Sequence, residues 1–260
     1  LTALKRPNLV AMECDVTNEK QIDQVRQYVT EKTQDDSSFL YALVNNAGII
    51  VPGHFVLFDD LDGFQRVLDV NFLGQVRMVH ALLPLLLKTK GTRIINTSST
   101  MGVTAMPGTA SYSAAKYAIE GFSESLRREL RPLGVHIIVV RPGNFKTDMP
   151  SKCRKDFLQN WSKSSDWRKE VMGGESFKDT FIKGFDDAAA MGQSPQMVVD
   201  DIIRAIEEQK PWHTRYTGWD AKTLFRVMVI LPYQVSDFVA SLLMPDPPVS
   251  SKNDDSKKAE

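Results

Sequence analysis

Short apolar runs alternate along this chain with longer segments of helical periodicity, and this alternation limits the folds that are open to it. We predict strands at residues 9–14, 42–44, 93–96 and 135–140, with helices at about 17–33, 61–87, around residue 112 and from Ser194-Pro195 onward. Strands separated by helices of this length form parallel crossovers. The sequence therefore predicts an α/β fold, a doubly wound parallel sheet with helices on both faces.

Polar or turn-forming residues follow four of these runs directly. Asp15, Asn45, Ser99 and Pro142 each come just after a predicted strand. Ligands of open α/β sheets bind beyond the carboxyl ends of the strands. We therefore expect four separate loops to converge on one ligand site.

Tyr112 and Lys116 lie four residues apart in a segment whose apolar residues recur at helical spacing. The two side chains therefore occupy neighbouring turns on one helix surface. A cation in that position stabilises a phenolate, so we expect Lys116 to bring the pKa of Tyr112 toward neutrality. Tyr112 would then serve as an acid/base group.

The ordered set of motifs resembles the short-chain dehydrogenase/reductase family over about residues 9–245. The matching blocks are Asp15-Val16, Asn45-Asn46-Ala47-Gly48, Asn71, Ser99, Tyr112-x-x-x-Lys116, and Pro142-Gly143 through Thr147. The resemblance implies one Rossmann-like domain that interconverts an alcohol and a carbonyl compound by hydride transfer with NAD or NADP, with NAD slightly favoured. A small-molecule substrate and a homo-oligomer are implied as well.

The resemblance also assigns roles to single residues. The implied catalytic residues are Ser99, Tyr112, Lys116 and Asn71. The implied cofactor-binding residues are Asp15, Val16, Asn45, Ala47, Gly48, Tyr112, Lys116, Pro142, Gly143, Phe145 and Thr147. Simpler interpretations stay open: Asp15 as a helix start, 45–48 as a turn, Asn71 as a hydrogen-bonded core amide, Ser99 as a strand end and Pro142-Gly143 as a loop start.

The N-terminal part lacks the strand and glycine-rich turn that hold a dinucleotide pyrophosphate in such folds. We expect a chain without its first βαβ glycine-turn segment, in which the strand at 9–14 has no partner. Such a chain would bind cofactor weakly. A non-catalytic interaction or scaffold protein of the same fold is therefore the alternative function.

Two C-terminal segments depart from the regular alternation. Residues 149–191 are expected to form a lid over the substrate, anchored by Trp161, Trp167 and Phe177, or else a surface excursion. Residues 220–244 are apolar but interrupted by polar residues and Pro232, so a transmembrane span is not expected. We expect two short helices hinged at Pro232, which either pack on the core or contact a membrane surface. Residues 246–260 are expected to be a disordered tail.

Composition excludes several other classes of function. The chain has 260 residues, of which 42% are hydrophobic, and its 32 basic and 32 acidic side chains leave no net charge that favours nucleic acid. Cys14 and Cys153 have no metal-ligand spacing and are expected to be reduced. The four histidines are scattered, so no metal site is expected.

Further residues resemble one branch of the family, which contains retinol, 17β-hydroxysteroid and D-3-hydroxybutyrate dehydrogenases. They are Gly134-Val135, the segment from Arg141 to Thr147, the stretch 122–130, Thr214-Arg215-Tyr216 and Leu231-Pro232. The substrate is therefore expected to be a lipophilic alcohol or 3-hydroxybutyrate. The same resemblance implies a membrane-associated location, at the endoplasmic reticulum or mitochondrion, with a cytoplasmic location as the alternative.

Overall fold

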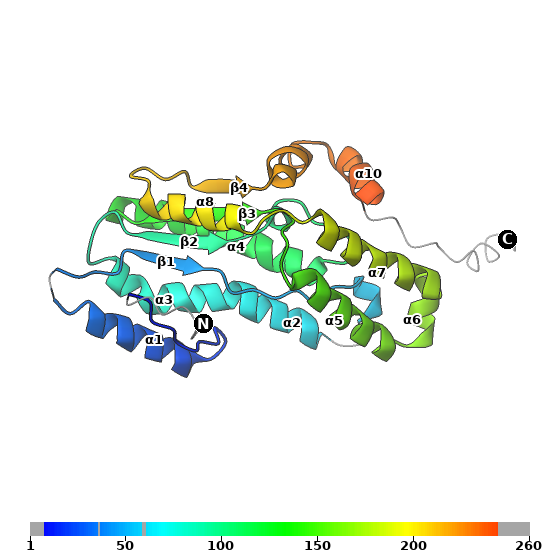
Figure 1. Ribbon diagram of the computed structural model, residues 1–260, viewed down its shortest axis with the longest axis horizontal. Helices are drawn as coiled ribbons and strands as arrows, with labels where there is room; N and C mark the ends of the chain where they lie inside the picture. The colour runs from blue at the N-terminus through cyan, green and yellow to red at the C-terminus, as the bar shows by residue number, and fades with distance from the viewer. Residues whose placement is uncertain (1–7, 36, 59–60, 244–260) are drawn as a thin grey trace, which may run out of the picture.

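Four parallel strands form the centre of the molecule, in the order β1-β2-β3-β4 (Figure 1). They are β1 (Ala42–Asn45), β2 (Arg93–Thr97), β3 (His136–Pro142) and β4 (Thr214–Thr217). This computed structural model describes residues 8–35, 37–58 and 61–243. The predicted single domain with a parallel sheet between layers of helices is confirmed.

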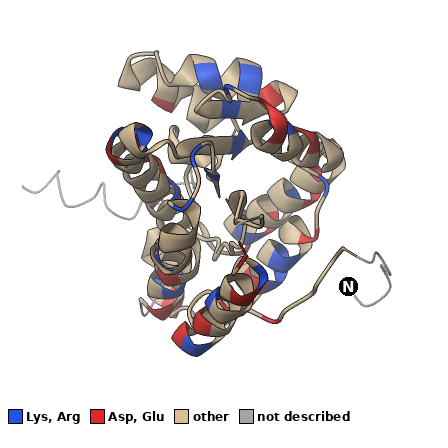
Figure 2. Ribbon diagram, turned by 90° about the vertical axis from the view of Figure 1, so that its left-hand side faces the viewer, with Lys and Arg blue, Asp and Glu red and all other residues tan. Residues whose placement is uncertain are grey.

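Helices follow each strand, as the alternation predicts. The longer helices are α1 (Glu19–Lys32), α2 (Asp62–Leu68), α3 (Gly74–Leu86), α4 (Ala110–Leu130), α5 (Met149–Lys163), α6 (Asp166–Val171), α7 (Gly174–Met191), α8 (Gln196–Glu207) and α10 (Tyr233–Leu243). Short helical turns are η1 (Phe55–Leu57), η2 (Asp69–Leu73), η3 (Thr100–Gly102), η4 (Arg131–Leu133), η5 (Ala221–Phe225) and α9 (Arg226–Met228). Acidic and basic side chains are mixed over these helices (Figure 2).

The two faces of the sheet bury different helices because successive strand residues point to opposite sides. On one face Leu43, Ile94 and Ile137 pack with apolar residues of α3 and α4. On the other face Ile95, Ile138, Val140 and Ala205 form a core under α8. Helix α8 contacts β2, β3 and β4. Val44 of β1, on the α8 side of the sheet, is 37% exposed.

The strand predicted at residues 9–14 is wrong. This segment has no regular structure, and Leu9 and Val10 are 50% and 58% exposed. A parallel strand is stabilised by a ladder with a neighbour, and within the described residues β1 is paired only with β2. An apolar, strand-like sequence that finds no ladder therefore stays irregular.

The helix predicted at 61–87 is continuous but contains a π-helical turn, η2, between α2 and α3. Such turns are frequent at functional sites. Directly after it, Gly74 allows the segment before α1 to lie close, because a Cβ on Gly74 would be only 2.5 Å from Val16 Cγ2. The chain before α1 is thereby held beside the residues of the π-helical turn.

Helices α5, α6 and α7 form a separate layer at one end of the sheet (Figure 1). They bury an aromatic cluster whose members are Leu57, Phe157, Trp161, Met172, Phe177 and Phe181. Trp161 and Phe177 are buried anchors, as predicted. Trp167 is not, because it points outward with 56% of its surface exposed.

The C-terminal part contains the two short helices that were predicted on either side of Pro232. Helix α9 ends before this proline, and the Pro232 carbonyl accepts hydrogen bonds from Val235 and Ser236 at the start of α10. Among the described residues, no helix is both long and apolar enough to cross a membrane. The tail predicted at 246–260 lies outside the described residues.

Candidate active site

Tyr112 and Ser99 meet where β2 ends and α4 begins. Ser99 follows β2 and caps the short turn η3, where its Oγ accepts a hydrogen bond of 3.2 Å from the Met101 amide. The Tyr112 hydroxyl is hydrogen bonded to Ser99, which acts to lower the pKa of Tyr112. Burial acts more strongly and raises the pKa of Tyr112 to about 12. The pair therefore lies as the spacing predicts, but with a protonated phenol.

Lys116 lies one turn further along α4 and is almost completely buried, with 3% of its surface exposed. Its Nζ donates a 2.8 Å hydrogen bond to the Thr97 carbonyl and lies 5.4 Å from the centre of the Tyr112 ring. Burial lowers the pKa of Lys116 to about 8, while Glu120 acts in the opposite direction. The expectation that Lys116 brings Tyr112 toward neutrality is therefore not met, because desolvation dominates the pKa of both groups.

The loop after β1 contains the predicted Asn-Asn-Ala-Gly motif. Its two asparagines differ, because one points into the sheet and the other is exposed. The Asn45 side chain is buried and donates to Asn96 Oδ1 at 2.9 Å, so it points into the sheet instead of toward a ligand. Asn46 accepts a 3.2 Å hydrogen bond from the Thr97 hydroxyl, and Asn46, Ala47 and Gly48 are exposed. The accessible part of the motif is therefore Asn46 to Gly48.

Asn71 lies in the π-helical turn and is fully buried. Its amide forms two hydrogen bonds of 2.7 Å with the backbone N–H and carbonyl of Ile49. This is the hydrogen-bonded core amide that the sequence left open as an alternative. A Cβ on Gly48 would lie 3.4 Å from Asn71 Oδ1 and 3.9 Å from Lys116 Nζ, so Asn71 fixes the loop beside the lysine.

Asp15 and Val16 precede α1. The exposed Asp15 carboxylate accepts hydrogen bonds of 2.9 and 2.8 Å from the amide and hydroxyl of Thr17. Thr17 is engaged there, and α1 is capped by the Asn18 side chain, so the helix begins two residues later than the predicted residue 17. The helix-start interpretation of Asp15 therefore fits its present contacts, and Val16 packs against Gly74.

The loop after β3 is fixed by two residues that the sequence analysis missed, Gln193 and Asp220. The Asp220 carboxylate accepts hydrogen bonds from the Asn144 amide at 2.7 Å and from Gln193 Nε2 at 2.8 Å, and it lies against Gly143. Phe145 is buried and forms a backbone bridge to Gln193, while Thr147 is exposed and its hydroxyl accepts a 3.3 Å hydrogen bond from the Met149 amide at the start of α5. No local pattern marks Asp220, because its partners lie far away in the sequence.

Helix α5 adjoins this site. Burial raises the pKa of the Cys153 thiol to about 12, and Cys153 in turn contributes to raising the pKa of Tyr112. A hollow of about 260 Å³ lies between α2 and α5 and includes Val51, which packs in the same cluster as Tyr112. The predicted reduced state of both cysteines agrees with their free thiols.

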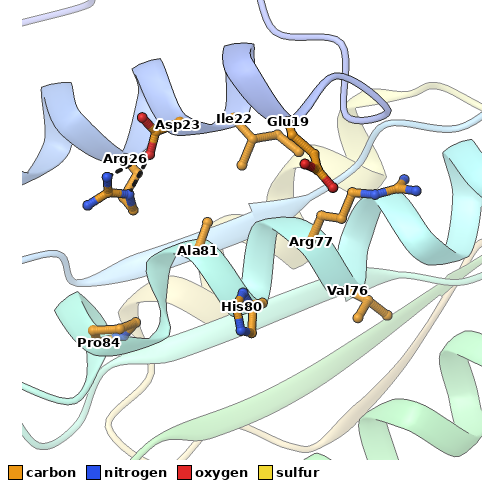
Figure 3. Close-up of a pocket in the computed structure, with 9 residues that line it drawn as sticks. All are labelled: Glu19, Ile22, Asp23, Arg26, Val76, Arg77, His80, Ala81 and Pro84. Atoms are coloured by element: carbon orange, nitrogen blue, oxygen red, sulfur yellow. Dashed lines mark hydrogen bonds and ion pairs between the residues drawn. The ribbon is translucent and has the colours of Figure 1, made fainter.

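A larger groove of about 710 Å³ lies between α1 and α3 (Figure 3). Ile22 of α1 and Ala81 and Pro84 of α3 are apolar residues on its two sides, and Asp23 and Arg26 of α1 pair with each other at its edge. None of its lining residues belongs to α4 or to the loops after the strands. This groove is therefore separate from Tyr112 and Lys116.

The site brings together a hydroxyl, a phenol and a buried ammonium group next to an exposed loop of small residues. Such a set polarises a carbonyl or alcohol oxygen and transfers a proton. The exposed backbone of Asn46 to Gly48 lies beside Lys116. Among the residues that the structure describes, no group of three or more His, Cys, Asp or Glu is placed to bind a metal.

Residues 1–157 match the family model described as short chain dehydrogenase. Retinol dehydrogenase 7 of Rattus norvegicus is 38% identical over 86% of this chain and 70% of its own length. Human 17-beta-hydroxysteroid dehydrogenase type 6 is 31% identical over 92% of this chain and 75% of its own. A short chain dehydrogenase from Burkholderia cenocepacia in complex with NADP shares the fold, with a TM-score of 0.65, 22% identity, and coverage of 92% and 82% of the two chains.

Proposed function

We propose that Ser99, Tyr112 and Lys116 carry out the proton chemistry of this chain, which belongs to the short-chain dehydrogenase family and is an NAD(P)-dependent oxidoreductase. In alcohol oxidation, Tyr112 takes up the hydroxyl proton as its own phenolic proton passes to the neutral Lys116 amine, while a hydride leaves the carbon that bears the hydroxyl group. Ser99 holds the substrate oxygen, since its hydroxyl interacts with Tyr112 and acts to lower the pKa of the phenol. The nicotinamide group, when bound, accepts the hydride and returns it in the reverse reaction. The adjacency of Ser99, Tyr112 and Lys116 is the observation that supports this assignment.

The other proposed roles follow from position. Lys116 holds the nicotinamide ribose beside Gly48, and Asn71 keeps the loop that carries Gly48 in place. Ala47, Pro142, Gly143, Phe145 and Thr147 are proposed to contact the cofactor, as are Asp15 and Val16 on the adenine side. Asn45 supports this loop through Asn96. NAD is the cofactor that we propose, although both nicotinamide nucleotides need to be assayed.

We propose that residues 149–191 form the lid over the substrate and that the substrate is a lipophilic alcohol of the retinol or hydroxysteroid type. The relatives named as retinol and 17-beta-hydroxysteroid dehydrogenases support this choice. The aromatic cluster of α5 and α7 supports it as well, because it supplies apolar rings within the segment that we propose as the lid. A short hydroxy acid such as 3-hydroxybutyrate needs a cation for its carboxylate and gains little from such surface.

A substrate panel tests this proposal. Initial rates of the purified protein are measured with all-trans-retinol, a 17β-hydroxysteroid and D-3-hydroxybutyrate, each with NAD and with NADP. We expect kcat/KM for a lipophilic alcohol to exceed that for D-3-hydroxybutyrate by about 100-fold, which corresponds to burying roughly one large apolar group. Equal values, or a preference for the hydroxy acid, would contradict the lipophilic substrate.

We propose in addition that residues 224–243 contact a membrane surface and that the protein is a homo-oligomer. Support for membrane contact comes from exposed apolar side chains on α10: Phe238 is 63% exposed and Leu242, one turn later, is 69% exposed. Ile230 and Tyr233, which precede them, are 79% and 85% exposed. Tyr233, Phe238 and Leu242 lie on α10 and Ile230 lies in the turn before it, so the exposed apolar side chains gather in one short segment, which is typical of interfacial segments.

The change Phe238→Asp with Leu242→Asp is expected to reduce flotation with phosphatidylcholine vesicles at least tenfold, because each buried apolar side chain contributes about 1.5–3 kcal/mol. Ser236→Asp is the matched control, since it adds a charge to α10 at a position nearly opposite Phe238 on the helix. If the double variant floats as well as the parent protein, the proposed membrane contact is elsewhere or absent.

A further inference from the structure

Glu120 and Arg141 form an ion pair that is not explained by the chemistry described so far. Two hydrogen bonds join them, Arg141 Nε to Glu120 Oε1 at 2.9 Å and Arg141 Nη2 to Glu120 Oε2 at 2.8 Å. The side chains are only 17% and 14% exposed. A bidentate pair with this little solvent contact is screened far less than a surface pair.

The position of this pair connects three parts of the site. Glu120 lies on α4 one turn beyond Lys116 and two turns beyond Tyr112, so the three side chains follow one another along a single surface of the helix. Arg141 lies on β3 immediately before Pro142, where the loop beside Asp220 begins. The pair therefore bridges the helix that carries Lys116 and the strand that leads into the loop.

A second layer of contacts holds the arginine in place. Arg141 Nη1 donates to the Tyr216 hydroxyl on β4 at 2.7 Å, and its guanidinium lies 4.9 Å from the centre of the Tyr216 ring. The guanidinium of Arg226 lies over the same ring at 5.8 Å. Arg141 is thus fixed against rotation, and the Glu120 carboxylate with it.

We propose that Glu120 and Arg141 are positioning residues whose opposite charges together set the electrostatic potential at Lys116 and Tyr112. This inference rests on the proposed catalytic role of those two residues. A carboxylate one turn from a buried ammonium group stabilises the protonated lysine, and Arg141 limits this effect by neutralising the carboxylate. The pair thereby sets the pH range in which the site releases a proton, without touching substrate or cofactor.

The surroundings of Lys116 support this inference. Among the described residues, Glu120 is the charged group that raises the pKa of Lys116. The pKa of Tyr112 is lowered by Ser99 and raised by Cys153. The elements packed against α4 carry further ionisable groups: Asp62, Arg66, Asp69, Arg131 and His136. Arg141 acts on the lysine through Glu120, to which it donates two hydrogen bonds. Glu120, held by Arg141, is therefore the charge through which this part of the chain stabilises the protonated lysine.

The test measures the pH dependence of kcat/KM for alcohol oxidation in single and double variants. Glu120→Gln leaves the Arg141 cation uncompensated, which favours deprotonation, so the midpoint of the rising limb should move to lower pH. Arg141→Gln leaves the Glu120 anion uncompensated, so the midpoint should move to higher pH. For charges about 6–12 Å away along the helix, each shift is about half a pH unit to one unit.

The double variant Glu120→Gln with Arg141→Gln removes both charges, so its midpoint should return to within about 0.2 units of the parent value. Glu124→Gln is the matched control, because Glu124 pairs with Arg128 one turn further along α4 but both side chains are more than half exposed. This control should leave the midpoint unchanged, since exposed pairs are well screened.

A purely structural role gives a different pattern. In that case both single variants would lower the melting temperature or kcat while the midpoints stay fixed, and the proposal would be overturned. If a single variant does not fold, the exchanged pair Glu120→Arg with Arg141→Glu keeps the attraction but places the cation nearer Lys116. Its midpoint should fall, and an unchanged midpoint in this folded variant rejects the proposal.

The failure of this inference is distinguishable from failure of the proposed function. If Tyr112→Phe and Lys116→Met abolish activity but the pair variants leave the midpoint unmoved, only the positioning role is wrong. If Tyr112→Phe retains activity, the catalytic assignment itself is wrong.

Discussion

Tyr112→Phe is expected to reduce kcat for alcohol oxidation by about 100- to 10,000-fold, the usual contribution of a positioned acid/base group. The substitution removes a single hydroxyl whose contact within the site is the hydrogen bond to Ser99. The ring still packs against Val51, Val67 and Ala115, so the fold should be preserved. Cofactor affinity should therefore change little, because the lost hydroxyl matters mainly in the transition state.

Steady-state rates and nicotinamide fluorescence titration check this expectation together. Tyr117→Phe is a suitable control because Tyr117 lies on the same helix but is 46% exposed and points away from the core. It should retain the activity of the parent protein. Turnover of the Tyr112 variant within tenfold of the parent would show that the proton is carried by another group.

Strands β1, β2 and β3 were predictable because each contains a short apolar run bounded by turn residues, as in Ile94 to Asn96 and Ile137 to Val140. Strand β4 was not predicted, because its sequence, Thr-Arg-Tyr-Thr, is not an apolar run. Residues 9–14 have the same local pattern as β1, β2 and β3 but no ladder, so the prediction failed there. Strand formation depends on a neighbour in space, which periodicity does not report. The prediction that Trp167 is a buried anchor was also wrong, because composition alone does not show which side of a segment faces the core.

Within the site, side chains one helical turn apart were predictable and distant partners were not. Tyr112 and Lys116 are linked by the helix period, and Glu120 continues the same row, so its charge was readable in principle. Arg141 comes from β3, and only the parallel register of β3 with β2 and β4 brings it to Glu120 and Tyr216. Asn45 shows the reverse case, because a motif residue is directed inward by Asn96 on the neighbouring strand.

The direction of the pKa shifts was the least predictable property. Spacing alone indicates that a lysine near a tyrosine lowers the pKa of the phenol, but it says nothing about how deeply both groups are buried. In the structure, burial raises the pKa of Tyr112 and lowers that of Lys116. Desolvation therefore outweighs the mutual attraction of the ammonium group and the phenolate.

Lys116→Met is expected to lower activity and at the same time to stabilise the protein. The lysine ammonium is buried with the Thr97 carbonyl as its hydrogen-bond acceptor, and burial lowers the pKa of Lys116 from 10.5 to about 8. A shift of this size corresponds to about 3 kcal/mol of unfavourable burial of the charged form. Loss of the hydrogen bond to Thr97 offsets about 1 kcal/mol of this, so the net gain at pH 7 is about 2 kcal/mol.

The pH dependence of stability separates this explanation from a simple packing effect. Because the folded pKa lies below the unfolded one, the unfolded parent protein binds more protons between about pH 8 and 10.5. The free energy of unfolding of the parent protein should therefore rise with pH across this window, whereas that of the Met variant should lack this rise. Denaturant titrations at pH 7 and pH 10 measure the difference directly.

Activity should show a second, independent change in the same variant. Of Tyr112 and Lys116 in the parent protein, Lys116 loses its proton first, because its pKa is about 8. The rate of alcohol oxidation should therefore rise with pH around that value. Without the lysine, the remaining group is the phenol, whose pKa burial raises to about 12, so the rising limb should move to higher pH by at least about one unit. An unchanged profile, or a Met variant less stable than the parent protein at pH 7, would mean that Lys116 is not the buried, strained cation on which this mechanism depends.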